Sequence, residues 1–428
     1  MEKSLNTFLQ TTYRERELIS LVWIGFLLYT LSFTLSTTTY VNYIICQVLQ
    51  IIGLLMFFPS FFVLAKFRLR NDYLQVLFTL YMIWIAFIFI RGFTTSFDQI
   101  KFMIFDAWFG GILYLSPLFL LLPLKLFYIQ RLFQAIFILA IAFLFYDAFF
   151  IKDLLRQGES LTSLNIVEYF SKTLAVPAFF LLMAYRYHSN RRKFFLIIVL
   201  LVTTFFAIIR ARRGLLIMCG LTAVFAYLLY LGQTRNKLFL VMLTILTGGI
   251  LLVFGIEFFT SHNNEIFDYI TDRGLEDTRS NVELCFYTDM GFTDWIIGKG
   301  MDGEYFCPGI DPDDVTGYRG TIETDYLQFI LKGGVVSVIL FLLIMIPAIF
   351  KGLFLSNNLL SKAAACWIIW ILLNMYPSTI NTFTLQYILL WISVAICFSP
   401  FIRTMEEEEL TDYLQNYKNY TLDKSRKS

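Results

Sequence analysis

Apolar residues form runs along this chain that are long enough to cross a lipid bilayer as helices. A spanning helix needs about 20 mostly apolar residues, and the pattern predicts about twelve such segments. They are Leu18–Ser36, Val41–Ala65, Tyr73–Ile90, Phe102–Leu122, Tyr128–Phe150, Ile166–Tyr187, Phe194–Ile209, Gly214–Gly232, Leu238–Phe259, Asp325–Phe350, Ala363–Ser378 and Leu385–Ile402. The fourth and sixth segments carry the charged residues Asp106, Glu168 and Lys172 within the apolar run. The pattern predicts an all-α polytopic membrane protein.

The composition points to the same class. Hydrophobic residues make up 58% of the chain and charged residues 15%, whereas soluble domains carry about a quarter charged residues. This balance excludes an ordinary soluble protein. The chain has only 2 His, which disfavours multi-histidine metal chemistry, and no Cys-x-x-Cys pair, which excludes zinc ribbons and thioredoxin-like redox motifs. No metal and no cofactor is expected. With a net charge of +2, no nucleic-acid partner is expected either.

Basic residues fall in alternate connections between the predicted spans, and this alternation sets the orientation. The basic clusters are Arg14/Arg16, Lys66/Arg68/Arg70, Lys125/Arg131, Arg191/Arg192/Lys193, Arg235/Lys237, Lys351/Lys362 and the tail after Arg403. The pattern predicts that both termini are cytoplasmic. No cleavable signal peptide is predicted, because the first apolar run lacks a small-residue cleavage site and a second span follows at once.

One outward connection breaks this rule, because it contains Arg210, Arg212 and Arg213. No Asp or Glu occurs between Glu168 and Glu257, so these guanidiniums have no carboxylate partner nearby in the sequence. Arg210 and Arg213 are three residues apart and would share a helix face. Arginine binds phosphate through two parallel hydrogen bonds, so an anion site is favoured. The alternatives are that the side chains reach lipid headgroups or pair with acids of a distant loop.

A long hydrophilic loop, Thr260–Glu323, also faces outward. From Thr260 to Asp325 it has fifteen acidic residues against four basic ones, and it contains several aromatic residues, which disordered segments lack. We therefore expect a small folded cap with short helices. Cys285 and Cys307 would form either a disulfide or two free thiols. Residues 311–314 favour a solvated turn over a calcium site, because they lack EF-hand spacing.

Candidate chemistry lies at the end of this loop. Arg279 falls in a predicted helix, Thr278–Met290, and Ile-Ile-Gly-Lys-Gly at 296–300 predicts a strand or tight turn. Thr321 could cap the tenth span, with Glu323 and Asp325 in its first turn. Simple capping is the favoured role of Asp325. Glu323 would either do the same or serve as a general base at the membrane surface.

Together these features resemble the O-antigen polymerase and O-antigen ligase superfamily. The resemblance rests on the twelve spans, Arg212-Arg213-Gly214, the Arg279 helix, Gly-x-Gly at 298–300 and a polar-Tyr-Leu…Gly-Gly helix start. Its specific matches lie at about 209–214 and 279–334. The family typically has Ser-Arg-Gly where this chain has Arg212-Arg213-Gly214. It often has His-Asn-x-Tyr-Leu where this chain has Glu323-Thr324-Asp325-Tyr326-Leu327, and the missing His fits a polymerase better than a ligase.

The resemblance implies a GT-C-like fold and a function. The expected reaction is metal-independent, inverting polymerisation of undecaprenyl-diphosphate-linked oligosaccharide repeat units into O-antigen or capsular-type polysaccharide, at the outer face of a bacterial inner membrane. By position, Arg213 and Arg279 would hold the lipid diphosphate together with Arg210 and Arg212, and Glu323 would replace the catalytic His. Residues that could support the site are Arg273, Arg319, Asp325 and Tyr326. A flippase and a chain-length regulator are partner candidates besides the lipid bilayer.

Two other functions stay open. One is an O-antigen ligase that transfers the finished glycan to a different acceptor, and the other is a transporter or flippase for the lipid-linked repeat. Residues that could line a transport path are Asp106, Asp147, Glu168, Lys172 and Glu257. The expected organisation is residues 1–259 with spans one to nine, 260–322 as the extracytoplasmic loop, 323–403 with spans ten to twelve, and 404–428 as a cytoplasmic tail.

Overall fold

The computed structural model describes residues 11–38, 40–92, 96–155, 161–234, 236–242, 244, 246, 279–309 and 316–415. In these ranges eight helical segments are long and apolar enough to cross a membrane. They are α2 (Tyr13–Ser36), α3 (Tyr43–Leu64), α4 (Asp72–Ile90), α6 (Leu126–Phe149), Ile166–Met183, α10 (Asn190–Ile209), α11 (Arg213–Gln233) and α16 (Asp325–Phe354). The prediction of an all-α, multi-pass membrane protein is confirmed at this level.

Four of the twelve predicted spans have no full-length helix among these eight. Three of them correspond to shorter apolar helices, namely η1 (Gly111–Leu121), α17 (Leu359–Asn374) and α18 (Leu385–Phe398). The ninth, Leu238–Phe259, lies largely outside the described residues. The count of twelve therefore stays a prediction.

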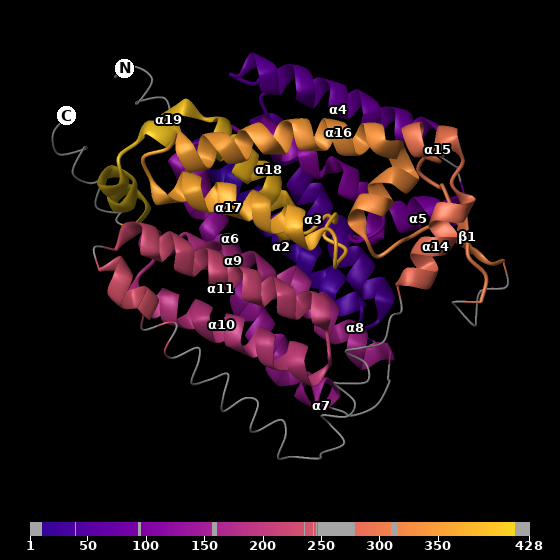
Figure 1. The fold of residues 1–428 in the computed structure, drawn as a ribbon, viewed down its shortest axis with the longest axis horizontal. Helices are drawn as coiled ribbons and strands as arrows, with labels where there is room; N and C mark the ends of the chain where they lie inside the picture. The colour runs from indigo at the N-terminus through magenta and orange to yellow at the C-terminus, as the bar shows by residue number, and fades with distance from the viewer. Residues whose placement is uncertain are drawn as a thin grey trace.

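The helices form a layered bundle with a small cap at one end (Figure 1). In Figure 1, α4, α16, α17, α9 (Val176–Met183), α11 and α10 follow one another from top to bottom with similar axes. The elements α14 (Ser280–Asp289), α15 (Phe292–Ile297) and β1 (Tyr305–Phe306) lie at one end, and α19 (Pro400–Thr404) lies at the other. The remaining short elements are α5 (Phe97–Phe105), α7 (Ile151–Leu154), α8 (Leu161–Phe170), the π-helix η2 (Ser171–Ala175), η3 (Tyr185–Tyr187) and β2 (Tyr318–Arg319).

The centre of the bundle is formed by α17 and α18. Every residue of α18 is buried, and the indole rings of Trp367 and Trp370 on α17 stack at 4.6 Å. By contrast, α10 and α11 bury only a few residues and present Leu, Ile and Phe outward. An apolar face of this size on a helix surface is suited to contact with lipid.

The fourth predicted span, Phe102–Leu122, is not one helix. Helix α5 ends at Phe105, and the chain turns at Asp106 before η1 begins at Gly111. The Asp106 carboxylate accepts hydrogen bonds from the backbone N–H groups of Trp108, at 2.7 Å, and Phe109, at 2.9 Å. Aspartate competes in this way with the helical hydrogen-bond pattern, so the apolar run breaks at its single charged residue.

Helix α16 is also interrupted, and the cap is attached at the interruption. Gly334 has φ 67°, and a Cβ there would collide with the Ile296 backbone. The backbone N–H of Lys299 donates to the carbonyl of Leu331 at 2.7 Å, and that of Gly300 donates to Lys332 at 3.0 Å. Ile296 and Ile297 are the last residues of α15 and Gly298 is its C-cap, so the prediction of a strand or tight turn at 296–300 is wrong for the first two residues.

The cap is folded over its described residues. The strands β1 and β2 pair antiparallel with Tyr305 opposite Arg319, and a disulfide joins Cys285 of α14 to Cys307. Phe286 and Tyr305 are fully buried in a separate apolar cluster. The described part of the loop is thus folded, and of the two alternatives for the cysteines the structure has the disulfide. Residues 247–278, with Arg273, and the 311–314 turn lie outside the described residues.

Candidate functional site

The connection between α10 and α11 is a tight reversal of the chain. Arg210 is the C-cap of α10, Ala211 has φ 49°, and α11 begins at Arg213. The backbone N–H of Arg212 donates to the carbonyl of Ala207 at 2.9 Å and closes the turn. Arg210 and Arg213 thus belong to different helices, and the expectation that they share a helix face is wrong. The Arg210 side chain is buried, whereas Arg213 is exposed.

The start of α11 packs against the connection between α17 and α18. A Cβ on Gly214 would lie 2.6 Å from the hydroxyl of Ser378 and 3.1 Å from the carbonyl of Pro377. A side chain at this position would displace the Ser378 hydroxyl and crowd the Pro377 carbonyl, so glycine favours the close approach. The Arg-Arg-Gly sequence therefore begins a helix directly beside Pro377–Ser378.

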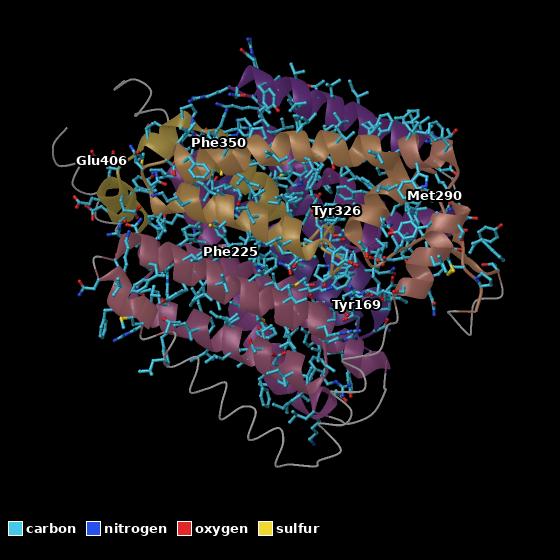
Figure 2. The ribbon with its side chains drawn as sticks, viewed as in Figure 1. Tyr169, Phe225, Met290, Tyr326, Phe350 and Glu406 are labelled. Atoms are coloured by element: carbon cyan, nitrogen blue, oxygen red, sulfur yellow. A yellow bond between two sulfur atoms is a disulfide. The ribbon has the colours of Figure 1, made fainter. Side chains whose placement is uncertain are left out.

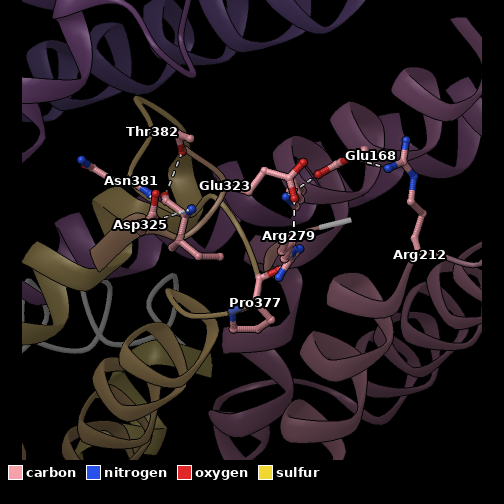
Figure 3. Close-up of polar contacts among 10 residues, drawn as sticks. Glu168, Arg212, Arg279, Glu323, Asp325, Pro377, Asn381 and Thr382 are labelled. Carbon is pink, nitrogen blue, oxygen red and sulfur yellow. Dashed lines mark hydrogen bonds and ion pairs between the residues drawn. The ribbon is translucent and has the colours of Figure 1, made fainter. Parts of the chain in front are cut away.

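Arg212 forms an ion pair with Glu168, at 3.2 Å between Nη1 and Oε2. The other oxygen of Glu168 lies 2.6 Å from the ammonium of Lys172, one helical turn further on. Arg212 thus has a carboxylate partner, although none lies nearby in the sequence, and this partner is not one of the acids of the distant loop. The sequence separation hid this pair, because α8 brings Glu168 back to the α10–α11 turn (Figure 3).

Lys172 is a buried cation that the expected site did not include. It lies in the π-helix η2, is 2% exposed, and has its ammonium 5.0 Å from the centre of the Trp108 ring. Single π-turns within α-helices are frequent at functional sites. The signal for Glu168 and Lys172 was present in the sequence, since opposite charges four residues apart inside an apolar span form an intramembrane pair.

Arg279 joins the cap to the bundle. It precedes α14 as the N-cap residue rather than lying within the predicted helix Thr278–Met290. Its Nε donates to Oε2 of Glu323 at 3.1 Å, and its Nη2 donates to the carbonyl of Pro377 at 2.8 Å. In Figure 3 its guanidinium lies between these two partners. Arg279, like Arg212, adds to the positive electrostatic environment of Glu168.

Glu323 precedes α16 and is accessible. The helix begins at Asp325 with Thr324 as N-cap, so the expectations that Thr321 caps it and that Glu323 lies in its first turn are wrong. The Glu323 side chain is 68% exposed, despite its ion pair with Arg279. The Thr324 hydroxyl donates to Glu283 of α14 at 2.9 Å instead of capping its own helix. A Glu323 carboxylate so placed can meet a substrate at the surface of the site.

Asp325 is fully buried and does more than cap a helix. Its Oδ2 accepts hydrogen bonds from the backbone N–H groups of Ile380, at 2.5 Å, and Asn381, at 2.7 Å. Its own N–H donates to the carbonyl of Met375 at 2.9 Å. The favoured role as a simple cap is therefore wrong. Asp325 holds the α17–α18 connection, which carries Pro377 and Ser378 (Figure 3).

The other expected supporting residues lie apart from these contacts. Arg319 is in β2 opposite Tyr305, and the Tyr326 hydroxyl donates to the carbonyl of Leu372 at 2.7 Å. Burial raises the pKa of the Tyr305 phenol, so its hydroxyl stays protonated and donates to the Thr321 carbonyl at 3.1 Å. Asp289 forms an ion pair with Lys299. The contacts of Arg319, Tyr305 and Asp289 lie within the cap, whereas that of Tyr326 joins α16 to α17.

The structure thus brings Arg279 beside both Glu323 and the Pro377 carbonyl, and Gly214 at the start of α11 lies beside the same connection. Arg212 lies at the neighbouring α10–α11 turn and is paired with Glu168, whose other oxygen contacts Lys172. Figure 2 shows Tyr169, the neighbour of Glu168, on the bundle side of this region, and Met290 within the cap. Two guanidiniums and an exposed carboxylate at one place can bind an anionic group and accept a proton beside it. Among the described residues, no group of three or more His, Cys, Asp or Glu could hold a metal ion.

No protein-family model matches this chain, and no curated protein and no solved structure is significantly similar to it.

Proposed function

We propose that this protein polymerises lipid-diphosphate-linked oligosaccharide repeat units by glycosyl transfer at the outer face of a bacterial inner membrane. The observation that carries the proposal is the position of Arg279, which contacts both Glu323 and Pro377 next to the start of α11. A phosphate-binding side chain from the cap thereby meets a carboxylate that can act as a base. The sequence resemblance to O-antigen polymerases assigns the same residues to these roles.

The cations serve the leaving group. Breaking the glycosidic bond to a diphosphate places negative charge on its oxygens, and guanidinium hydrogen bonds strengthen as this charge develops. Arg279 and Arg212 are held by carboxylates in the structure. A diphosphate would replace Glu323 as the partner of Arg279. Arg213, exposed at the first turn of α11, and Arg210 at the end of α10 add positive charge nearby.

Glu323 serves the acceptor. Once the diphosphate has taken over Arg279, the carboxylate is available to accept the proton of the attacking sugar hydroxyl. The hydroxyl oxygen bonds to the anomeric carbon, the bond from that carbon to the diphosphate oxygen breaks, and the electron pair leaves with the lipid diphosphate. Direct displacement of this kind inverts the anomeric configuration.

Glu168 and Lys172 position the cations. A buried ammonium beside a carboxylate is stable only while paired, and removal of one partner leaves an uncompensated charge. Glu168 bridges Lys172 and Arg212, so it fixes the guanidinium at the α10–α11 turn. We assign Glu168 as a positioning residue rather than a catalytic one.

The cap supports the outward orientation. Structural disulfides persist in oxidising compartments outside the cytoplasm, and the bond between Cys285 and Cys307 lies within the cap. The site lies where this cap meets the bundle, at the opposite end from α19. Both points favour chemistry on the outer side of the membrane.

The test uses the natural substrate. Deletion of the gene in its host should cause undecaprenyl-diphosphate-linked oligosaccharide to accumulate, and this lipid can be extracted and incubated with purified protein. Wild type should form a ladder of longer glycans. Arg279→Ala and Glu323→Gln should each slow polymerisation by about a hundredfold or more. Arg279→Lys should recover only part of the rate, because Lys binds phosphate as a point charge.

The matched control is Arg191→Ala, which removes an exposed guanidinium from the other end of α10. It should polymerise at the wild-type rate. Wild-type rates from both Arg279→Ala and Glu323→Gln would refute the assigned roles. Transfer of the glycan to a different acceptor would instead identify a ligase, and movement of the lipid-linked repeat without bond formation would identify a transporter.

A further inference from the structure

A cavity lies far from the cap, where α3, η1 and α18 end and α4 begins. It has a volume of about 470 Å³, within the range of about 300–1,000 Å³ of small-molecule pockets. It is lined by Lys66, by Arg68–Asn71 and Leu74, by Leu120–Leu124, and by residues of α18 and α19 together with Ser399 between them. Nothing in the proposed glycosyl transfer uses this cavity.

The two walls of the cavity differ in chemistry. One wall carries Lys66, Arg68 and Arg70, three exposed basic side chains within five residues. The other wall is mainly apolar and includes Leu120–Leu124, Phe398 and Phe401. None of the described residues that line the cavity is acidic. The cavity is therefore complementary to a molecule with an anionic head and a hydrocarbon body.

The backbone gives this cavity a fixed shape. The N–H of Lys66 donates to the carbonyl of Leu121 at 2.8 Å, which joins the basic wall to the apolar one. The Leu69 N–H donates to Gln75 of α4 at 2.6 Å, and the Tyr73 ring stacks on Phe398 at 6.3 Å. The basic segment thus lies against the helix ends rather than extending away from them.

We propose that this cavity binds an anionic phospholipid of the membrane leaflet at that end of the bundle. Its phosphate lies at Lys66, Arg68 and Arg70, and one acyl chain lies along the leucines of 120–124 and the phenylalanines of 398–401. Basic pockets between helix ends on the cytoplasmic side are suited to phospholipid headgroups. The positive-inside pattern accounts for basic residues in this connection. It does not account for an apolar cavity beside them, and that cavity is what the phospholipid explains.

The test measures lipid binding to delipidated full-length protein by native mass spectrometry. Phosphatidylglycerol should bind more tightly than phosphatidylcholine with the same acyl chains. Each cation near the surface contributes about a fivefold change in affinity, so replacing Lys66, Arg68 and Arg70 together by Gln should weaken phosphatidylglycerol binding by about a hundredfold. The matched control replaces Arg191, Arg192 and Lys193 by Gln and should leave it unchanged.

A second variant tests the cavity rather than its charge. Thr404 is exposed at the cavity wall, so Thr404→Trp should fill the space without disturbing the fold or the three cations. It should weaken phosphatidylglycerol binding at least fivefold. Glycerol 3-phosphate, which has the headgroup charge without acyl chains, should not compete.

Four results would overturn the proposal. Equal affinity for the two lipids would show that the cavity does not select an anionic headgroup. Equal losses in the two triple variants, or full binding by Thr404→Trp, would mean that surface charge alone attracts lipid. Competition by glycerol 3-phosphate would show a free phosphate site.

Discussion

Replacement of Asp325 by Ala should destabilise the protein and disable the candidate site together. The carboxylate accepts two backbone hydrogen bonds, from Ile380 and Asn381, and its side chain is fully buried. Hydrogen bonds to charged groups are worth about 1.5–3 kcal/mol each, so Asp325→Ala should cost about 3–6 kcal/mol of the free energy of unfolding. Asp325→Asn keeps an acceptor oxygen for both N–H groups. It should lose only the additional strength of a charged acceptor, about 2 kcal/mol.

The effect should reach Arg279 through the α17–α18 connection. Asp325 holds Ile380 and Asn381, and the same connection carries the Pro377 carbonyl that accepts from Arg279. In Asp325→Ala we therefore expect a fall in activity even at temperatures where the protein is still folded. Adding Asp325→Ala to Arg279→Ala should lower the activity little further. Each single change already removes the same contact, the hydrogen bond between Arg279 and the Pro377 carbonyl.

Reversible unfolding in mixed micelles, followed by tryptophan fluorescence, measures the free energies. The control is Asp412→Ala, an exposed carboxylate near the end of the described chain, which should change stability by less than about 0.5 kcal/mol. Equal stability of Asp325→Ala and wild type would refute the role assigned to these hydrogen bonds. An Asp325→Asn variant as unstable as Asp325→Ala would show that the negative charge, and not the acceptor oxygen, is required.

Two further predictions concern topology and the cap. In intact cells, a membrane-impermeant maleimide should label the cap variant Thr293→Cys but not Arg191→Cys. The opposite labelling pattern would reverse the proposed orientation. Gly334→Ala should loosen the cap, because Gly334 has φ 67° and an added Cβ would collide with the Ile296 backbone. Protease should therefore cut the cap of this variant faster than that of the control, Gly309→Ala. Gly309 also has a positive φ, 82°, but an added Cβ there would have no atom within 4 Å. Equal resistance of the two glycine variants would mean that the cap is not held at the break in α16.

The fold class followed from the order of residues alone because bilayer thickness fixes the length of a spanning helix. Runs of about 20 apolar residues cross lipid whatever their neighbours, since every backbone group is satisfied within the helix. For the same reason, the apolar runs at 13–36, 43–64 and 325–354 form helices at the expected places. The aromatic content of the loop likewise predicted a folded cap, although it left the state of Cys285 and Cys307 undecided.

Local breaks in the helices needed side-chain geometry. The pattern at 102–122 is apolar enough for one span, yet a single carboxylate at Asp106 captures two backbone N–H groups and turns the chain. The connection at 210–213 was expected from the apolar pattern, but the sharp reversal at Ala211, which has φ 49°, separates Arg210 from Arg213. Hydropathy averages over a window, so it does not register one hydrogen-bonding side chain that changes the direction of the backbone.

The grouping at the candidate site was decided by the tertiary structure. Arginine, glycine and carboxylate residues could be singled out by type, but their partners come from distant parts of the chain, as Glu168 does for Arg212 and Pro377 for Arg279. Sequence spacing governs contacts within one helix, whereas these contacts join different helices. They depend on which helix ends the bundle brings together, and that is set by the packing of buried side chains around α17 and α18.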